Sequence, residues 1–231
     1  MATFKWVKGV PSPMVLNVAC PKLTNFLRSA EQLYQFNTLV QILQGDIEKI
    51  EIIGDERVDG LAFPTGYDLK QYRSSYYASS AIFRRAGPKL DDHVRELKIR
   101  LKAGNAIVTP AFDAGVDKLI HCVGPYQYDG HHMRTLQQTY WSMLRCVHQE
   151  KLHCVAVASI STGAKRLPVI GAAWVALCAI QRYIRSVPWT ATIAIVCHSA
   201  RAYSAYTKSK AKVMSRFNAK YLRTSPTRDW Y

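Results

Sequence analysis

A polar segment that follows an apolar run is the clearest candidate for chemistry in this sequence. Residues 154–160 (Cys-Val-Ala-Val-Ala-Ser-Ile) predict a buried strand, and residues 171–185 predict a helix rich in small residues. A turn between such a strand and a helix offers unpaired backbone N–H groups, and Ser and Thr hydroxyls can add further donors to a phosphate. Two cations in the turn can hold an anion or be solvated. The candidate phosphate-binding residues are Ser161, Thr162, Gly163, Ala164, Lys165 and Arg166.

The sequence lacks the common arrangements of catalytic and metal-binding side chains. It contains no Gly-x-Ser-x-Gly elbow, no Gly-Lys-Ser/Thr phosphate loop and no Cys-x-x-Cys pair. The six cysteines are scattered, mostly among apolar neighbours, which is typical of buried thiols in a reducing compartment. Neighbouring acids such as Asp91 and Asp92 begin a predicted helix and suit its positive end. We therefore expect no catalytic nucleophile, no metal and no required cofactor.

The charge is strongly one-sided. Residues 130–231 carry 15 Lys and Arg against two acids, Glu150 and Asp229. Such a field favours a polyanionic partner, nucleic acid first and an anionic membrane surface second, over a merely solubilising surface. Near the C-terminus, aromatic residues are interleaved with cations; we expect the rings to pack inward and the cations to contact RNA. The predicted RNA-contacting residues are Lys208, Lys210, Lys212, Arg216, Lys220 and Arg223.

The elements that would position these residues alternate between strands and helices. With 231 residues and 48% apolar side chains, the chain is long enough for one large domain, and its longest apolar run, 169–180, is too short for a membrane span. The alternation predicts an α/β domain. Predicted strands cover residues 39–43, 50–53, 60–63, 106–109, 118–123, 154–160 and 191–197. Predicted helices cover residues 84–102, 135–146, 171–185 and 203–221.

Five segments in order resemble the macro domain family, whose members bind ADP-ribose and in some branches hydrolyse it from proteins. They are Gly-Asp-Ile at 45–47, Val-Asp-Gly-Leu at 58–61, the strands at 104–110 and 120–125, and Ser-Thr-Gly at 161–163. The resemblance runs from about residue 39 to residue 206. It implies a three-layer α/β/α fold with a mixed central sheet, a basic C-terminal extension and ADP-ribose as a possible ligand.

The resemblance carries over well on one side of the implied site. In the family, the Asp of the Gly-Asp-Ile turn holds the adenine amino group, which assigns that role to Asp46 beside Ile47; capping of the following turn is an equally good account of Asp46. His198 stands at a strand end where the family often carries an aromatic residue near adenine, although a lone His there can be structural.

The other side departs from the family pattern. Where the family has Asn-Ala-Ala-Asn, this chain has Phe-Pro-Thr-Gly at 63–66, so Gly66 cannot position a ribose or a water. The glycine-rich loop is replaced by Ser-Tyr-Tyr-Ala-Ser-Ser-Ala at 75–81, with Ser79 in place of an Asp and tyrosines that cannot match the freedom of glycine. Lys165 and Arg166 replace the usual aromatic residue and second glycine of the phosphate turn. These changes predict a fold that is kept and an activity that is lost.

The sequence therefore predicts an extension (1–35), a macro-domain-like core (36–206) and a basic helix or tail (207–231). We expect a catalytically inactive, RNA-contacting component of a large ribonucleoprotein assembly such as a ribosome. The alternatives are an ADP-ribose reader or hydrolase with a divergent loop, and an assembly scaffold in a cytoskeletal array without nucleic acid. We expect an intracellular protein. The acid-poor start is compatible with mitochondrial import, whereas Pro11 and Pro13 oppose an amphipathic helix there, so mitochondrial and cytoplasmic locations both stay open.

Overall fold

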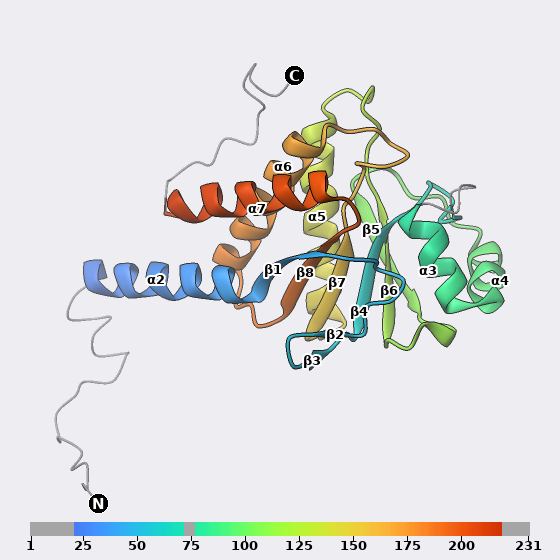
Figure 1. Cartoon of the computed structure of the whole chain (residues 1–231), viewed down its shortest axis with the longest axis horizontal. Coiled ribbons are helices and arrows are strands. Elements are labelled where there is room, and N and C mark those ends of the chain that lie inside the picture. The colour runs from blue at the N-terminus through green and yellow to red at the C-terminus, as the bar shows by residue number, and fades with distance from the viewer. Residues whose placement is uncertain (1–20, 72–76, 219–231) are drawn as a thin grey trace, which may run out of the picture.

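The computed structural model describes residues 21–71 and 77–218, which form a six-stranded sheet between two layers of helices (Figure 1). The strand order is β1-β8-β7-β4-β6-β5, and only β5 runs antiparallel to its neighbour. The strands are β1 (Val40–Gln44), β4 (Gly60–Pro64), β5 (Asn105–Pro110), β6 (Lys118–Val123), β7 (Cys154–Ala158) and β8 (Thr192–Cys197), with a small hairpin of β2 (Ile52–Ile53) and β3 (Glu56–Arg57) beside them.

The sheet confirms the predicted mixed topology and the central place of the apolar run at 154–160. β7 pairs with β8 on one side and β4 on the other, and all five of its residues are buried. Alternate residues of β7 belong to different hydrophobic clusters: Val155 and Val157 face one helical layer, and Ala156 faces the other. A strand that is covered on both faces has to be apolar throughout, which is the pattern of the sequence.

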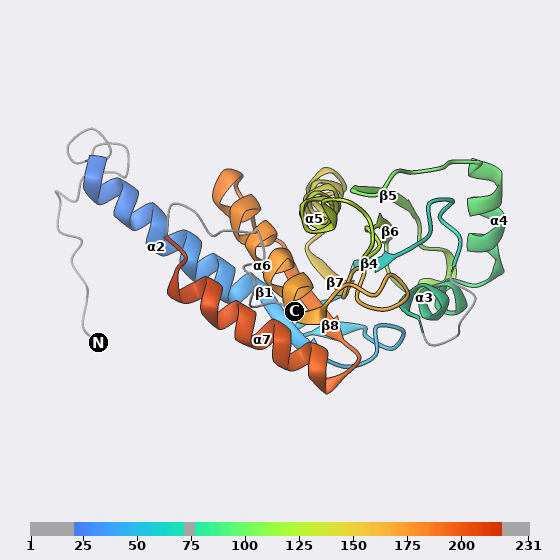
Figure 2. The ribbon, with the colours of Figure 1, turned by 90° about the horizontal axis from the view of Figure 1, so that it is seen from above.

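The helices are divided unevenly between the two faces of the sheet (Figures 1 and 2). α3 (Ala78–Ala86) and α4 (Pro88–Leu97), with the short η1 (Phe112–Ala114), cover one face. The other face is covered by α2 (Pro21–Leu39), α5 (His132–Gln149), α6 (Val169–Ser186) and α7 (Ala200–Ser215), among which α6 packs against both α5 and α7. The helix predicted at 171–185 is therefore confirmed as a cover of β7.

The single helix predicted for residues 84–102 is wrong. The chain forms α3 and α4 instead, and they are separated by Gly87, which has a φ of +78°. Pro88 has no N–H to continue the first helix but fits the first turn of the second. α4 then ends at Leu97, so residues 98–102 are not helical.

The final helix begins earlier than expected, because Ser199 caps it. The Ser199 hydroxyl oxygen accepts a hydrogen bond from the Ala202 N–H at 3.2 Å, and α7 runs from Ala200 to Ser215. The predicted boundaries at 35/36 and 206/207 fall within α2 and α7, both of which pack against the sheet; the division into three segments remains a proposal.

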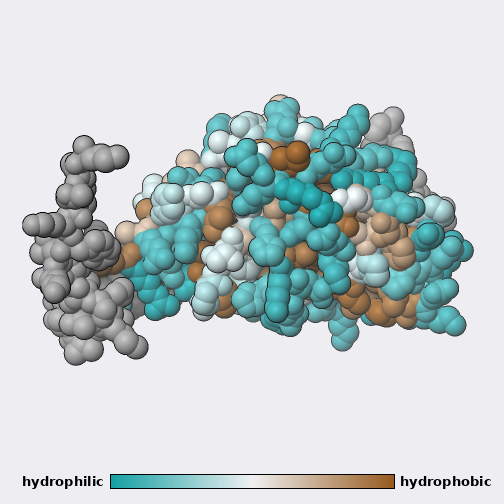
Figure 3. Space-filling view, turned by 90° about the horizontal axis from the view of Figure 1, so that it is seen from below, coloured by the Kyte–Doolittle hydropathy of each residue, from teal (hydrophilic) through white to brown (hydrophobic). Residues whose placement is uncertain are grey.

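The described surface carries no broad apolar area on the face seen from below, where hydrophobic residues form small separate patches (Figure 3). The five cysteines among the described residues are free and buried, as the sequence predicts, and Cys20 lies outside those residues. Within residues 21–71 and 77–218, no helix is both long and apolar enough to cross a bilayer.

Candidate functional site

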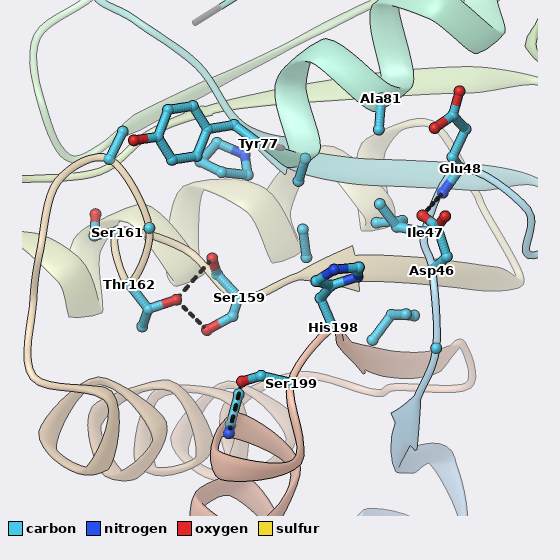
Figure 4. Close-up of a pocket in the computed structure, with 18 of the residues that line it drawn as sticks. Asp46, Ile47, Glu48, Tyr77, Ala81, Ser159, Ser161, Thr162, His198 and Ser199 are labelled. Carbon is cyan, nitrogen blue, oxygen red and sulfur yellow. Dashed lines mark hydrogen bonds between the residues drawn. The ribbon is translucent and has the colours of Figure 1, made fainter. Parts of the chain in front are cut away.

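A cavity of about 400 Å³ opens at the carboxyl ends of β1, β4, β7 and β8 (Figure 4). This is the edge at which parallel α/β sheets usually bind ligands, because loops and helix starts from several strands meet there. Three groups of residues form its walls. They are the turn at 45–48, the segment at 159–165 with Val169, and the start of α7 with His198, Ser199 and Ala202; Pro64, Tyr77 and residues of α3 complete the lining. The cavity brings together Asp46, Ile47, His198 and residues 161–165, which the sequence predicts as site residues.

Asp46 both caps its own turn and faces the cavity. Its Oδ1 accepts a hydrogen bond from the Glu48 N–H at 3.0 Å. The turn-capping account of Asp46 is therefore confirmed, whereas adenine binding stays a prediction, for which the second carboxylate oxygen, without a partner among the described residues, is available. The imidazole ring of His198 points into the same part of the cavity (Figure 4), and His198 is exposed.

Two arginines of α3 hold this turn in place. Arg84 donates to both carboxylate oxygens of Glu48, at 3.0 Å from Nε and 2.5 Å from Nη2, and this pair spans the rim of the cavity. The hydrogen bond to Glu48 raises the pKa of Arg84. Arg85 donates to the carbonyl oxygens of Ala114 and Ile50, at 2.6 and 2.7 Å. The turn that carries Asp46 is thus fixed from the side of α3.

The turn after β7 presents a row of unused hydrogen-bond donors to the cavity. The backbone N–H groups of Thr162, Gly163 and Ala164 have no acceptor among the described residues. The turn itself is closed by other groups, since the Arg166 and Leu167 N–H groups bond to the carbonyl oxygens of Gly163 and Ser161 at 2.9 Å. Successive N–H groups that point into a concave loop form a site for an anion.

Ser161 adds to this arrangement. Only 2% of Ser161 is exposed, and its hydroxyl oxygen has no hydrogen-bond partner among the described residues. The residue adopts a left-handed φ of +65°, a conformation that is uncommon for a residue with a side chain. Its hydroxyl packs so closely on Gly124 that a Cβ there would lie 2.2 Å away, so this close approach requires a glycine at 124.

Lys165 is buried rather than solvated. Its ammonium donates to the Gly124 carbonyl oxygen and lies 4.9 Å and 5.1 Å from the ring centres of Tyr126 and Tyr67. Burial lowers the pKa of Lys165 to about 8, and the nearby charge of Asp129 opposes this shift. Arg166, in contrast, is exposed and has a φ of +58°, the kind of conformation for which glycine is the easiest residue.

The positions at which the sequence departs from the family pattern contribute unequally to the cavity wall. Tyr77 lines the cavity, and its ring packs against Gly163, where an added Cβ would lie 3.4 Å from the ring (Figure 4). Gly66 sits in a turn in which its N–H bonds to the Lys70 carbonyl, and Ser79 is fully buried on α3; neither residue lines the cavity. Residues 75 and 76 of the predicted loop lie outside the described residues.

Four of the predicted RNA-contacting cations lie on α7 or directly after it. Lys208 and Arg216 are exposed, whereas Lys210 is half-buried and donates to the Asn37 carbonyl oxygen at 2.9 Å. The Lys212 ammonium lies 5.1 Å from the Trp174 ring centre. Lys220 and Arg223 lie outside the described residues.

Sequence reasoning missed two contacts of the site, the Glu48–Arg84 pair and the hydroxyl contact between Ser159 and Tyr206. Both join residues that are far apart in the sequence, so no local motif could reveal them.

Comparisons with known proteins agree with this geometry. A model of the macro domain family matches residues 74–176. The chain is 30% identical to O-acetyl-ADP-ribose deacetylase 1 of Pantoea vagans over 176 residues, which cover 73% of this chain and 96% of that protein. It is 28% identical to a macro domain-containing protein of Xanthomonas campestris, over 74% of this chain and 95% of the relative.

Solved structures of macrodomains are also similar to this chain. The Oceanobacillus iheyensis macrodomain with ADP aligns with a TM-score of 0.69 and 25% identity, over 77% of this chain and 92% of that one. The Trypanosoma brucei macrodomain in complex with ADP-ribose, at 20% identity and a TM-score of 0.62, shares the fold. The three-layer architecture, the order of the motifs and the similarity over almost the full length of a relative together show that this chain belongs to the macro domain family.

Proposed function

We propose that this protein binds ADP-ribose, or a closely related adenine nucleotide, and recognises it without cleaving it. The observation that carries the proposal is the row of unused N–H donors at Thr162, Gly163 and Ala164 beside the buried, unpartnered hydroxyl of Ser161. Asp46 stands elsewhere on the lining of the same cavity with one carboxylate oxygen unused. An anion-binding loop and a carboxylate that can accept from an amino group suit a phosphorylated adenosine.

The relatives leave open whether the bound nucleotide also reacts, because one of them is named a deacetylase of O-acetyl-ADP-ribose. Two features support recognition alone. Gly66 has no side chain with which to hold a ribose or a water, and the hydroxyl of Ser79 lies buried within α3 rather than on the cavity wall. The resemblance assigns an Asn and an Asp to these two positions, and in this proposal their replacement removes the groups that would position a reacting water.

Calorimetric titration with ADP-ribose tests the binding step. Asp46→Asn keeps the acceptor for the Glu48 N–H but replaces the second oxygen by an amide that cannot accept from adenine. We expect about tenfold or greater loss of affinity, since hydrogen bonds to charged groups contribute roughly 1.5–3 kcal/mol. Asp68→Asn is the matched control, because Asp68 also accepts from a backbone N–H two residues ahead but does not line the cavity.

Incubation with O-acetyl-ADP-ribose tests the second step. The expected result is binding with no release of acetate above a blank. Release of acetate that Asp46→Asn abolishes would replace this proposal with a deacetylase.

We propose nucleic acid as a second ligand, on α7. Arg201 and Lys208 on α7 and Arg216 directly after it are exposed, and none of them forms an ion pair with a described residue. Changing these three to Gln should lower RNA affinity and make its logarithm fall less steeply with the logarithm of salt concentration, by about 0.7 for each single-strand phosphate that the variant no longer neutralises. A triple change of Arg57, Lys70 and Arg95, which pair with carboxylates, is the control. An unchanged slope in the α7 variant would exclude this face.

A further inference from the structure

A chain of hydroxyl groups leads from the hydrophobic core to the wall of the cavity. The Tyr140 hydroxyl on α5 lies 3.1 Å from that of Tyr206 on α7, which lies 2.9 Å from the Ser159 hydroxyl at the end of β7. Thr162, in the anion-binding turn, donates to the same Ser159 oxygen at 2.8 Å, as Figure 4 shows. Both tyrosines are fully buried, whereas Ser159 is half-buried and lines the cavity.

The donors and acceptors along this chain set the direction of its protons. The Tyr140–Tyr206 contact could run in either direction, but the other group within hydrogen-bond distance of the Tyr140 hydroxyl, the Ile160 N–H at 3.5 Å, can only donate. The buried Tyr140 proton therefore has an acceptor only when Tyr140 donates to Tyr206. Tyr206 then has Ser159 as the acceptor for its proton. Burial raises the pKa of both tyrosines, that of Tyr206 to about 12, so both phenols keep their protons at neutral pH.

Ser159 therefore receives two hydrogen bonds, one from Tyr206 and one from Thr162. A hydroxyl oxygen has two lone pairs and one proton, so both lone pairs are used and the proton remains. No described protein atom accepts this proton in addition to the contacts above. The proton is left for an acceptor in the cavity.

We propose that Ser159 donates a hydrogen bond to an anionic phosphate oxygen of the bound nucleotide, and that Tyr206 is the positioning residue that directs it there. The inference rests on the proposed nucleotide binding and names the part of the ligand that Ser159 contacts. The phosphate is favoured over the base, because Ser159 precedes the turn whose unused N–H groups and Ser161 hydroxyl already suit an anion. The neutral Tyr206 hydroxyl contributes orientation without adding charge.

The test compares ADP with adenosine, which has the same base and ribose but no phosphate. Ser159→Ala and Tyr206→Phe should each weaken ADP binding about tenfold, the effect of one hydrogen bond to a charged group, and leave adenosine binding unchanged. The double variant should bind ADP no more weakly than Ser159→Ala alone, because Tyr206 acts through Ser159. Tyr183→Phe is the matched control, because Tyr183 is a half-buried tyrosine of α6 that does not belong to the chain of hydroxyl groups.

The outcomes are distinct. If the wild-type protein binds neither ADP-ribose nor ADP, the proposed function fails and this inference fails with it. If ADP binds to the wild type, the inference alone is overturned by any of three results: equal weakening of ADP and adenosine, additive effects in the double variant, or unchanged ADP affinity. Should Tyr206→Phe fail to fold, which a melting curve would reveal, Ser159→Ala with its half-exposed side chain still decides the result.

Discussion

Replacing Lys165 by Met should change how the stability of this protein depends on pH. The pKa of Lys165 is lowered from 10.5 to about 8, chiefly because burial disfavours the charged form. Folding must therefore place a charged ammonium among the rings of Tyr67 and Tyr126, with the Gly124 carbonyl as its hydrogen-bond acceptor. Burying the charged ammonium costs free energy of folding. Met has a similar length and no charge, so Lys165→Met removes this penalty.

The direction in which the unfolding free energy changes with pH follows from the number of protons that the folded and unfolded states bind. A lysine whose folded pKa is lowered is protonated in both states below pH 8, so the whole penalty is present there. Between pH 8 and 10.5 the unfolded chain binds more protons, and stability rises with pH. At 1.36 kcal/mol per pKa unit, a shift from 10.5 to about 8 makes the difference in unfolding free energy, wild type minus Lys165→Met, rise by about 3 kcal/mol from pH 7 to pH 10.5.

Urea unfolding of both proteins at several pH values measures this difference. The wild-type curve alone is not sufficient, because buried tyrosines and cysteines with raised pKa values reduce stability at high pH; their effect is common to both proteins and cancels in the difference. Lys208→Met, on an exposed lysine, is the control and should give a flat difference. A flat difference for Lys165→Met as well would refute the assignment of a buried, destabilised ammonium.

Three further substitutions follow from single contacts. Asp59→Asn should cost about 2 kcal/mol in urea unfolding without changing nucleotide affinity, because Asp59 accepts from the His153 and Cys154 N–H groups at the end of the sheet away from the cavity. Gly124→Ala should destabilise by roughly 1–3 kcal/mol and weaken ADP binding, since its Cβ would lie 2.2 Å from the Ser161 hydroxyl; Gly130→Ala, with open space around it, should do neither. Tyr77→Gly should strengthen ADP-ribose binding relative to ADP, as measured by calorimetry, because it removes the ring that packs on Gly163.

The fold was predictable because its main signals are local. The residues of β7 and β8 are apolar without alternation, and both strands are buried on both faces. The break between α3 and α4 was also present in the sequence as Gly87 and Pro88, but the apolar spacing that continues through it into α4 concealed it. Residue spacing marks which side of a helix is buried more reliably than where the helix ends.

The site was predictable only where backbone chemistry defines it. Ser161, Thr162 and Gly163 come soon after the end of β7 in the sequence, and all three line the cavity at the carboxyl end of that strand. The burial of Lys165 could not be predicted in this way, because Tyr67 and Tyr126 reach it from two other loops. The same holds for Tyr206, which lies 47 positions after Ser159 and joins it only once α7 packs on the sheet.

The departures from the family pattern are physically connected. A lysine at 165 needs an acceptor and rings once it is buried, and the Gly124 carbonyl with Tyr67 and Tyr126 provides them. Tyr77 packs over Gly163 in the same part of the cavity. Asp46 and the unused N–H groups of residues 162–164 are not involved in any of these contacts. The substitutions therefore change the surroundings of Lys165 and Gly163 and leave Asp46 and the N–H groups of residues 162–164 available to a ligand.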